Sequence, residues 1–418
     1  MTLYQYNNKG QLESVFYPYS KEFYEKQKAE AEENGLAVSN SAIENHVENQ
    51  YLSSAVKAKL IPLMNSMQYG LSFELTNLQT FIKESYTYDK NGNRKNKITP
   101  FGTIEYTYDK ENCLLSSGSK GIAFIEYTYD KKGNLLSAVS EARSIKYAYN
   151  SQNRIISCEQ LDKIKNTVSK TTYAYDSFGR RILVQDEGCP TIRTIYDSLS
   201  FDVIKQSPVF FNGLFTDTGD DGINWRKTGR PTGDRYRYLD EEKQKDDNRY
   251  VYLDDGNYKT ENTRFYGERF PLIYDGKIAA QYTLENGAEY FSTDLNGSVS
   301  ITTDFSGATY NSYSYDAFGN LIQGDLSGSS DFGYLSKQLD PTSVLYNYGY
   351  RDYSPASARF TTMDPIRDGN NWFTYCNNEP VNFVDLWGLE YRDRYGSWRA
   401  VSDKTYKLDA SMNNNSEK

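Results

Sequence analysis

Closely spaced tyrosine pairs set the pattern of apolar and polar positions along this chain. Each pair reads Tyr-x-Tyr, then Asp or Asn, then two variable residues, then Gly or Asn. The pattern begins at Tyr4, Tyr86, Tyr106, Tyr127, Tyr147, Tyr173 and Tyr313. Four successive copies are spaced by about twenty residues, and a recurrence of this length predicts a repeat architecture.

Each copy of the pattern predicts a β-hairpin. Residues two apart on a strand point to the same face, so Tyr127 and Tyr129 share a face. The segment 130–134 reads Asp-Lys-Lys-Gly-Asn, which is typical of a tight turn, and Leu135 begins the return strand. A single hairpin is marginal in water, so the hairpins must join edge to edge. We therefore predict a mainly β fold, an extended antiparallel sheet of hairpin repeats that curls or spirals.

Two stretches interrupt the repeats. Residues 21–82 predict a helical insertion, in which a capping box at Ser41 opens one helix. The sole histidine, His46, lies on that helix, and we expect it to be structural or exposed. A polar, Gly-rich stretch at 207–247 predicts a loop. Its first acidic cluster, 217–222, lacks the alternating Asp spacing of a calcium loop, so we interpret it as solvated.

Composition and charge argue against several classes of function. A net charge of −9 over 418 residues argues against a protein that binds nucleic acid. No run of 18 apolar residues predicts a membrane span, and the amino terminus lacks the features of an export signal. With one histidine and no nucleotide-binding fingerprint, we expect neither a metal nor another cofactor. Widely spaced cysteines predict no disulfide framework; they are Cys113, Cys158, Cys189 and Cys376.

The stretch 348–389 is densest in charged, aromatic and turn-forming residues, and it contains the candidate catalytic residues Arg351, Asp364 and Asp385. Two carboxylates brought close cannot both ionise comfortably, so one keeps a proton and acts as an acid while the other acts as a base toward water. An arginine beside them can hold one carboxylate ionised or bind a developing oxyanion. Asp-Pro turns and Arg–Asp pairs also serve structure alone, so the residues by themselves leave catalysis open.

The repeats and this stretch together resemble the RHS family, whose YD repeats also occur in the C component of bacterial Tc toxin complexes and in teneurins. The resemblance covers most of residues 83–389 and part of the first twenty. The family's core motifs correspond to Arg351-Asp352-Tyr353-Ser354-Pro355, Ala358-Arg359-Phe360, Asp364-Pro365 and the run from Asn377 to Asp385. The resemblance implies a spiral β-strip that builds a hollow shell, with the RHS-associated core capping it.

The same resemblance implies an aspartyl-protease-like centre that cuts its own chain. Carried over by motif, its functional residues are Arg351, Asp364 and Asp385, and the cut falls between Leu389 and Glu390. The chain departs from the family pattern at four positions, where Asp352 replaces Tyr, Ser354 replaces Asp, Ala358 replaces Gly and Leu386 replaces Pro. These departures bear on turn geometry and on how the strand to be cut is presented.

These predictions divide the chain into five parts. They are a partial repeat (1–20), the helical insertion (21–82), the repeat sheet (83–320), the RHS-associated core (321–389) and a short variable tail (390–418). The tail has 29 residues (418 minus 389), which is too few for an enzymatic domain.

We expect an RHS-type shell scaffold that encloses a C-terminal toxin or effector segment and releases it by cutting after Leu389. Its expected partners are its own C-terminal segment and secretion or toxin-complex components. The family is secreted or found at the cell surface, and this chain is expected in the cytoplasm before delivery. The alternative is a non-enzymatic surface protein whose exposed tyrosines bind glycans or another protein, or a truncated remnant of a larger RHS protein.

Overall fold

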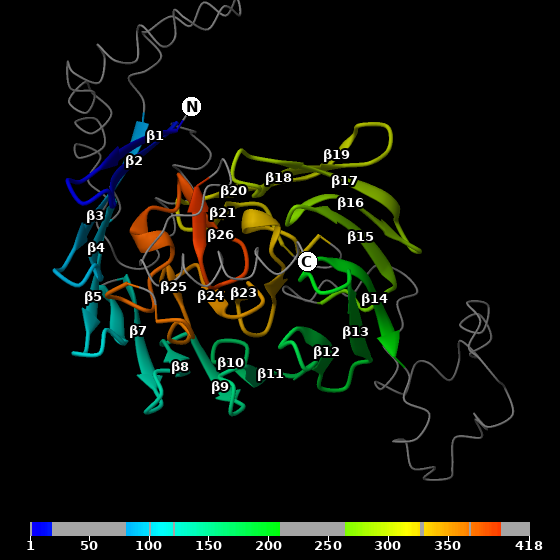
Figure 1. Cartoon of the computed structure of the whole chain (residues 1–418), viewed down its shortest axis with the longest axis horizontal. Coiled ribbons are helices and arrows are strands. Elements are labelled where there is room, and N and C mark those ends of the chain that lie inside the picture. The colour runs from blue at the N-terminus through cyan, green and yellow to red at the C-terminus, as the bar shows by residue number, and fades with distance from the viewer. Residues whose placement is uncertain are drawn as a thin grey trace, which may run out of the picture. The chain divides into compact units, whose positions relative to one another are not determined.

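The computed structural model describes residues 2–18, 81–99, 102–119, 122–209, 264–326, 330–367 and 369–393. These residues form antiparallel hairpins joined by short turns, and this part of the chain contains 3-10 turns but no α-helix (Figure 1). Accordingly, none of its helical segments is long and apolar enough to cross a bilayer. The mainly antiparallel β class predicted from the tyrosine pattern is confirmed.

Most of the predicted insertion and polar loop lies outside the described residues, including Ser41, His46 and the cluster at 217–222. One boundary is corrected. Strand β3 begins at Phe81, so the last two residues assigned to the insertion are strand, because the alternation of the next hairpin already starts there. At the other stretch, β14 extends to Val209 before the described chain breaks off.

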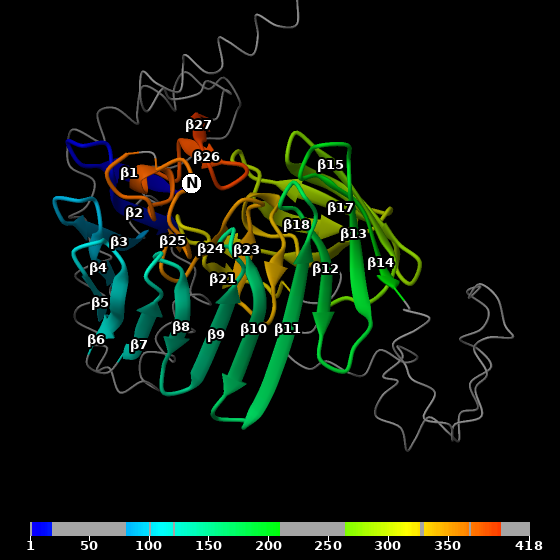
Figure 2. The same ribbon diagram turned by 60° about the horizontal axis from the view of Figure 1, so that its bottom comes forward.

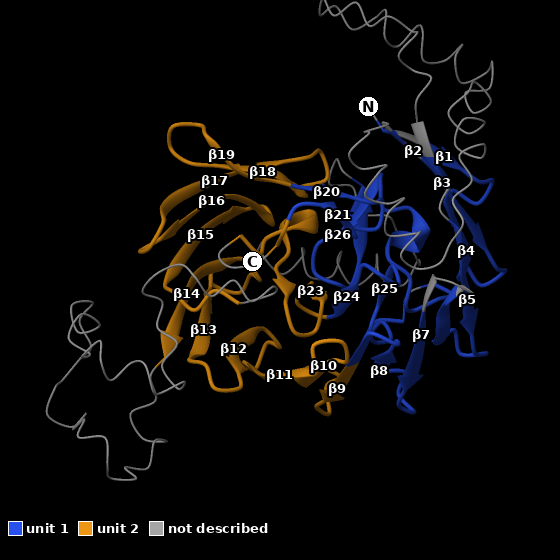
Figure 3. Cartoon of the chain, turned by 180° about the vertical axis from the view of Figure 1, so that it is seen from behind, with its two compact units in different colours: residues 1–144, 313–324, 351–418 blue, residues 145–312, 325–350 orange. Residues whose placement is uncertain are grey.

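The chain divides into two compact units (Figure 3). Unit 1 comprises residues 1–144, 313–324 and 351–418, and unit 2 comprises residues 145–312 and 325–350.

Unit 1 begins with hairpin strands that each pair with the next strand along the chain. They are β1 (Leu3–Tyr6), β2 (Leu12–Pro18), β3 (Phe81–Tyr88), β4 (Arg94–Thr99), β5 (Gly102–Tyr108), β6 (Leu114–Ser119), β7 (Ile122–Tyr129) and β8 (Leu135–Val139). Shorter antiparallel pairs follow later in the sequence. They are β20 (Ser314–Tyr315) with β21 (Leu321–Gln323), β24 (Asp352–Ser354) with β25 (Arg359–Phe360), and β26 (Phe383–Asp385) with β27 (Tyr391–Asp393).

Unit 2 repeats the arrangement, and Figure 2 shows its first strands side by side in chain order. Its strands are β9 (Arg143–Tyr149), which starts two residues before the unit, β10 (Ile155–Asp162), β11 (Thr167–Tyr175), β12 (Arg181–Asp186), β13 (Thr191–Tyr196), β14 (Val203–Val209), β15 (Arg269–Tyr274), β16 (Lys277–Thr283), β17 (Gly287–Thr293), β18 (Val299–Thr303) and β19 (Thr309–Ser312). A shorter hairpin follows, β22 (Leu339–Asp340) with β23 (Leu345–Asn347).

The acidic or amide residue after each tyrosine pair explains why the turns fold. Between β3 and β4, Oδ1 of Asp89 accepts backbone N–H bonds from Asn91 at 2.8 Å and from Asn93 at 2.9 Å. Gly92 closes the turn with a φ of +79°, a conformation that glycine adopts without strain. The same pair of bonds recurs at Asn7, Asp109, Asp130, Asn150, Asp176, Asp294, Asp304 and Asp316.

The two tyrosines of a pair have different roles. The first is exposed at Tyr4 and buried in the other six pairs, at Tyr86, Tyr106, Tyr127, Tyr147, Tyr173 and Tyr313. The second donates its hydroxyl to the carbonyl that opens the return strand of the preceding hairpin. In unit 1, Tyr88 bonds Leu12 at 2.7 Å and Tyr108 bonds Arg94 at 2.9 Å. In unit 2, Tyr175 bonds Ile155 in the same way. At these three positions a side chain as well as strand pairing connects a hairpin to the one before it.

In each unit, segments from late in the sequence pack on the hairpins. A buried cluster in unit 1 joins Leu12, Val15 and Tyr86 of the hairpins to Phe318, Ala358 and Val381. In unit 2, ion pairs connect the later segments to the hairpins. Arg264 lies 2.9 Å from Asp186 and 2.9 Å from Asp340, and Arg269 lies 2.8 Å from Asp331. The core segment of unit 1, residues 351–393, carries the candidate site.

Candidate active site

The guanidinium of Arg351 faces both carboxylates predicted for the site. Its Nη2 lies 3.5 Å from Oδ2 of Asp364 and 3.6 Å from Oδ2 of Asp385. All three side chains are buried, with exposed fractions of 5%, 6% and 3% respectively. In water such pairs contribute little, but burial strengthens the interaction and makes an unpaired charge costly. The fold thus brings together the three residues that the sequence singled out, and we call Asp364 and Asp385 the acid pair.

Backbone carbonyls and an aromatic ring fix the position of Arg351. Its Nε donates to the carbonyl oxygen of Gly388 at 2.6 Å, and its Nη1 donates to that of Trp372 at 3.1 Å. The guanidinium carbon lies 3.7 Å from the centroid of the Phe360 ring, a close cation–π contact. The fork of the guanidinium can therefore keep its third nitrogen directed at the acid pair.

Asp385 ends β26 and organises the turn that follows it. Its Oδ1 accepts N–H bonds from Trp387 at 3.1 Å, Gly388 at 2.6 Å and Leu389 at 3.2 Å. Burial raises the pKa of Asp385 to about 6, although Arg351 and the three amides act in the opposite direction. Near neutral pH this carboxyl therefore holds a proton more readily than an ordinary aspartate.

Asp364 lies in the loop between β25 and the 3-10 turn at Cys376–Asn378. Its backbone N–H donates to the Trp372 carbonyl at 3.0 Å, and its Oδ1 accepts the N–H of Ile366 at 2.9 Å. The Trp372 carbonyl also accepts from Arg351. One backbone oxygen thus holds both an acidic and a basic member of the site.

The predicted cut lies in the turn of the hairpin formed by β26 and β27. Asp385 pairs with Tyr391 in register, and the rings of Phe383 and Tyr391 meet edge to face at 5.5 Å. The bond between Leu389 and Glu390 lies in this turn, directly before β27 begins at Tyr391. The strand pairing therefore presents the peptide close to the carboxyl that opens the turn.

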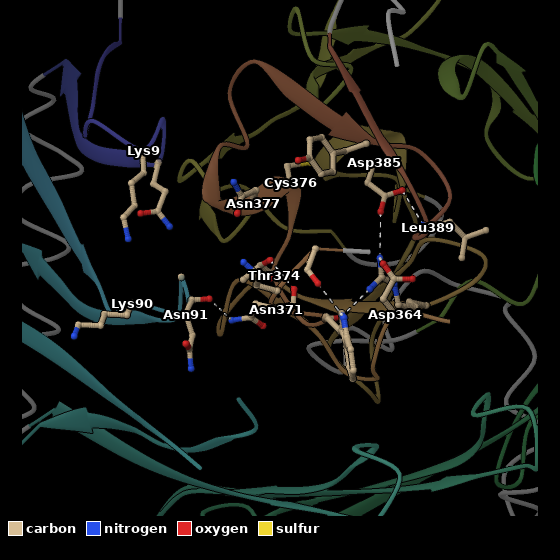
Figure 4. Close-up of a pocket in the computed structure, with 17 residues that line it drawn as sticks. Lys9, Lys90, Asn91, Asp364, Asn371, Thr374, Cys376, Asn377, Asp385 and Leu389 are labelled. Atoms are coloured by element: carbon tan, nitrogen blue, oxygen red, sulfur yellow. Dashed lines mark hydrogen bonds and ion pairs between the residues drawn. The ribbon is translucent and has the colours of Figure 1, made fainter. Parts of the chain in front are cut away.

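A cavity of about 320 Å³ adjoins the acid pair. Asp364, Asp385 and Leu389 line one end of it, and Lys9 and Lys90 lie toward the other end (Figure 4). A space of this size admits several water molecules, which hydrolysis requires.

The segment before β26 has a strained backbone and contains a buried cysteine. Cys376, Asn377 and Asn378 are consecutive left-handed residues with φ of 46°, 51° and 62°, a conformation that costs energy outside glycine. Cys376 is buried, and burial together with the charge of Asp385 raises the pKa of its thiol. The Cys376 thiol therefore stays protonated and is a poor nucleophile.

Sequence reasoning missed Phe360 as a support for Arg351, the Trp372 and Gly388 carbonyls, and Tyr375, whose hydroxyl accepts the N–H of Asp385 at 3.3 Å. One signal was available. Asp385 is followed three residues later by Gly388, the same spacing as in the hairpin turns at Asp89 and Asp130. In the described ranges, no three His, Cys, Asp or Glu side chains gather as metal ligands would.

Comparisons with known proteins agree with the repeat geometry. A model of the teneurin YD-shell family matches residues 63–200. Over those residues the chain is similar to the YD-repeat shell family. The chain is also 30% identical to the tRNA3(Ser)-specific nuclease WapA of Bacillus spizizenii over 256 residues, which are 51% of this chain and 10% of that protein.

The YD-repeat chain is also similar to a second relative, the toxin subunit YenC1 of Yersinia entomophaga. The two are 31% identical over 120 residues, which are 26% of this chain and 12% of that protein. The chain thus spans about a tenth of the length of the curated relatives it matches. A solved structure of TcdB2-TccC3 aligns with 77% of this chain and 23% of that chain, with 16% identity and a TM-score of 0.28.

Proposed function

We propose that this YD-repeat protein cuts its own chain between Leu389 and Glu390 and releases the segment that follows. The observation that carries this proposal is the position of Asp385. It opens the turn that contains the bond, and it is buried with Arg351 and Asp364 beside a cavity. An intramolecular peptide held beside its catalytic groups needs no separate binding step, so a modest site suffices.

The acid pair supplies the acid and the base of this proposed hydrolysis. Asp364 accepts a proton from a water molecule whose oxygen bonds to the carbonyl carbon of Leu389. Asp385, whose pKa is raised to about 6, donates its proton to the nitrogen of Glu390 as the carbon–nitrogen bond breaks. The products are a carboxylate on Leu389 and an amine on Glu390. Arg351 stabilises the negative charge that develops on the way.

Intact-mass measurement during cell-free synthesis of the full chain tests the proposal. We expect wild type to give two fragments that meet between Leu389 and Glu390, whereas Asp364→Asn and Asp385→Asn each give one full-length chain. Asp304→Asn is the matched control, because Asp304 is a partly exposed turn residue and Asn occupies the same turn position at Asn7 and Asn150. A wild-type chain that stays intact, or acid-pair variants that cleave as the wild type does, would contradict the proposal.

The released segment is the proposed cargo of a YD-repeat shell. The names of the relatives support this role, since one is a nuclease and the other a toxin subunit. Toxin-complex or secretion components would then be the partners, and the chain would act outside the cell that makes it. Fractionation of cells that carry epitopes on both sides of Leu389 tests this, and retention of both epitopes in the cytoplasm would oppose delivery.

An exposed aromatic face in unit 2 supports the second candidate function, binding without cleavage. Phe270 of β15 and Tyr282 of β16 are directly paired across the strands, and both are exposed, as is Tyr290 of β17. Flat exposed rings of this kind suit the faces of sugars or of a protein partner. An intact wild-type chain that binds oligosaccharides, with binding lost in Tyr282→Ala, would favour this candidate over self-cleavage.

A further inference from the structure

We propose that Asn93, in the turn between β3 and β4, is a positioning residue for the acid pair, so that self-cleavage depends on the docking of that hairpin. This inference rests on the proposed self-cleavage. Asn93 is 1% exposed, and the two polar atoms of its side-chain amide serve two different parts of the unit. Its Nδ2 serves the repeat turns, and its Oδ1 serves the core segment.

The Nδ2 atom of Asn93 completes the local turn. It donates to Oδ2 of Asp89 at 2.9 Å and to Oδ1 of Asn112, in the next hairpin turn, at 2.8 Å. Asn134 makes the equivalent bond to Asp130 at 2.8 Å, and its backbone N–H bonds the turn aspartate as that of Asn93 does. The two asparagines are therefore equivalent within their own turns.

The Oδ1 atom of Asn93 faces the core segment. It accepts hydrogen bonds from Nη1 of Arg359 at 3.0 Å and from Nδ2 of Asn371 at 2.6 Å. Arg359 also donates through Nη2 to the carbonyl of Asn112 at 2.6 Å, and Asn371 donates to the carbonyl of Asn91 at 3.2 Å. Arg359 and Asn371 flank the loop that contains Asp364. The β3–β4 and β5–β6 turns therefore hold both ends of this loop.

The linkage continues from Asn371 to the acid pair through the next residue. The carbonyl of Trp372 accepts the backbone N–H of Asp364 at 3.0 Å and Nη1 of Arg351 at 3.1 Å. A movement of Asn371 therefore moves the carbonyl that fixes the base and the cation of the proposed reaction. Catalytic geometry is sensitive to such movement, since a displacement of about 1 Å can lower a rate by about a hundredfold.

The consequence is an ordering of events. The acid pair has its working geometry only when the turns carrying Asn93 and Asn112 are packed against the core segment. A chain whose β3–β4 hairpin has not docked keeps the bond after Leu389 intact. The hairpins of unit 1 are therefore folded before the segment that follows Leu389 is released.

The test compares Asn93→Ala with its matched control Asn134→Ala in the full chain, by following cleavage over time during cell-free synthesis. Both variants lose a bond inside their own turn, but only Asn93→Ala loses the bonds to Arg359 and Asn371. We expect Asn134→Ala to cleave within about twofold of wild type and Asn93→Ala to cleave at least about tenfold more slowly. Equal rates in the two variants would overturn the inference.

Asn93→Asp separates positioning from stability. This variant keeps an acceptor for Arg359 and Asn371 but loses the Nδ2 donor and faces the carboxylate of Asp89, so its turn is at least as destabilised as in Asn93→Ala. We expect it to cleave faster than Asn93→Ala despite an equal or lower melting temperature, measured in an Asp364→Asn background. Cleavage that simply follows melting temperature across the variants would overturn the inference. A wild-type chain that does not cleave would instead overturn the proposed function itself.

Discussion

Arg351 donates through Nε to the carbonyl oxygen of Gly388 at 2.6 Å, one residue before the proposed cut. The residue that faces the acid pair therefore also holds the backbone that is to be cleaved. An arginine in this position can act on the substrate strand and on the carboxylates at once, which a compact ammonium group cannot.

Arg351→Lys separates charge from geometry. The lysine keeps the positive charge beside the acid pair but lacks the planar fork that reaches Gly388 and Trp372 together. We expect cleavage to slow by at least about tenfold, the effect of losing a positioned charged hydrogen bond. Arg193→Lys, at an exposed position of β13, is the control and should cleave as wild type does. Full cleavage in Arg351→Lys would show that charge alone is sufficient.

The rate of self-cleavage should fall as the pH rises through about 6. Burial raises the pKa of Asp385 to about 6, and the proposed reaction uses its protonated form as the acid. Single-turnover cleavage of chain refolded into buffers from pH 5 to pH 8 measures this. A rate that is constant across that range, or one that rises with pH, would remove Asp385 from the acid role.

The pH dependence of the free energy of unfolding should also reflect the raised pKa of Asp385. The folded chain holds the Asp385 proton to about pH 6, whereas an unfolded chain loses it near 3.8, so this group makes the fold less stable as pH rises between these values. Replacing Asp385 by Asn removes that loss. In an Asp364→Asn background, we expect the additional Asp385→Asn change to raise the free energy of unfolding at pH 7, relative to its effect at pH 4, by up to about 3 kcal/mol. Denaturant titrations at the two pH values measure the difference, and an equal effect at both would contradict a raised pKa.

Gly388→Ala should impair the site through its backbone. Gly388 has a φ of +77°, and in that conformation its N–H reaches Asp385 while its carbonyl reaches Arg351. An alanine there costs about 1 kcal/mol and favours a turn that breaks one of these bonds. Gly307→Ala is the control, since Gly307 has a φ of +84° and an added Cβ meets nothing within 4 Å. We expect both variants to lose similar stability and only Gly388→Ala to cleave slowly, as intact mass would show.

Removing a single tyrosine hydroxyl between two hairpins should lower the stability of the fold. Tyr88→Phe deletes the bond to the Leu12 carbonyl and should lower the free energy of unfolding by about 1 kcal/mol. Tyr282→Phe, on an exposed face, should change it by much less. Urea titrations of both variants in the Asp364→Asn background make the comparison. Equal effects would mean that the tie between successive hairpins contributes no net stability.

The sequence was most informative where interactions are local. The turn at Asp89 is built from residues within four positions of one another, so its spacing alone predicted it. The three site residues were found because charged groups clustered in one stretch and matched family motifs. The bond from Arg359 to Asn93 spans 266 positions, and no local pattern distinguishes Asn93 from Asn134. Phe360 likewise gave no signal, since its contact with Arg351 exists only once the core segment has folded.

The hydroxyl ties between successive hairpins have an evolutionary consequence. The β3–β4 hairpin shows both halves of this contact. Its Tyr88 donates to the Leu12 carbonyl of the preceding hairpin, and its Arg94 carbonyl accepts from Tyr108 of the following hairpin. A gene segment encoding one such hairpin is therefore a self-contained building block that can be duplicated or deleted without inventing a new contact. The turns that hold Asn93 and Asn112 are exceptions, because they also bond the core segment. Insertion of further hairpins should therefore be tolerated on either side of these two hairpins, while both of them stay in place.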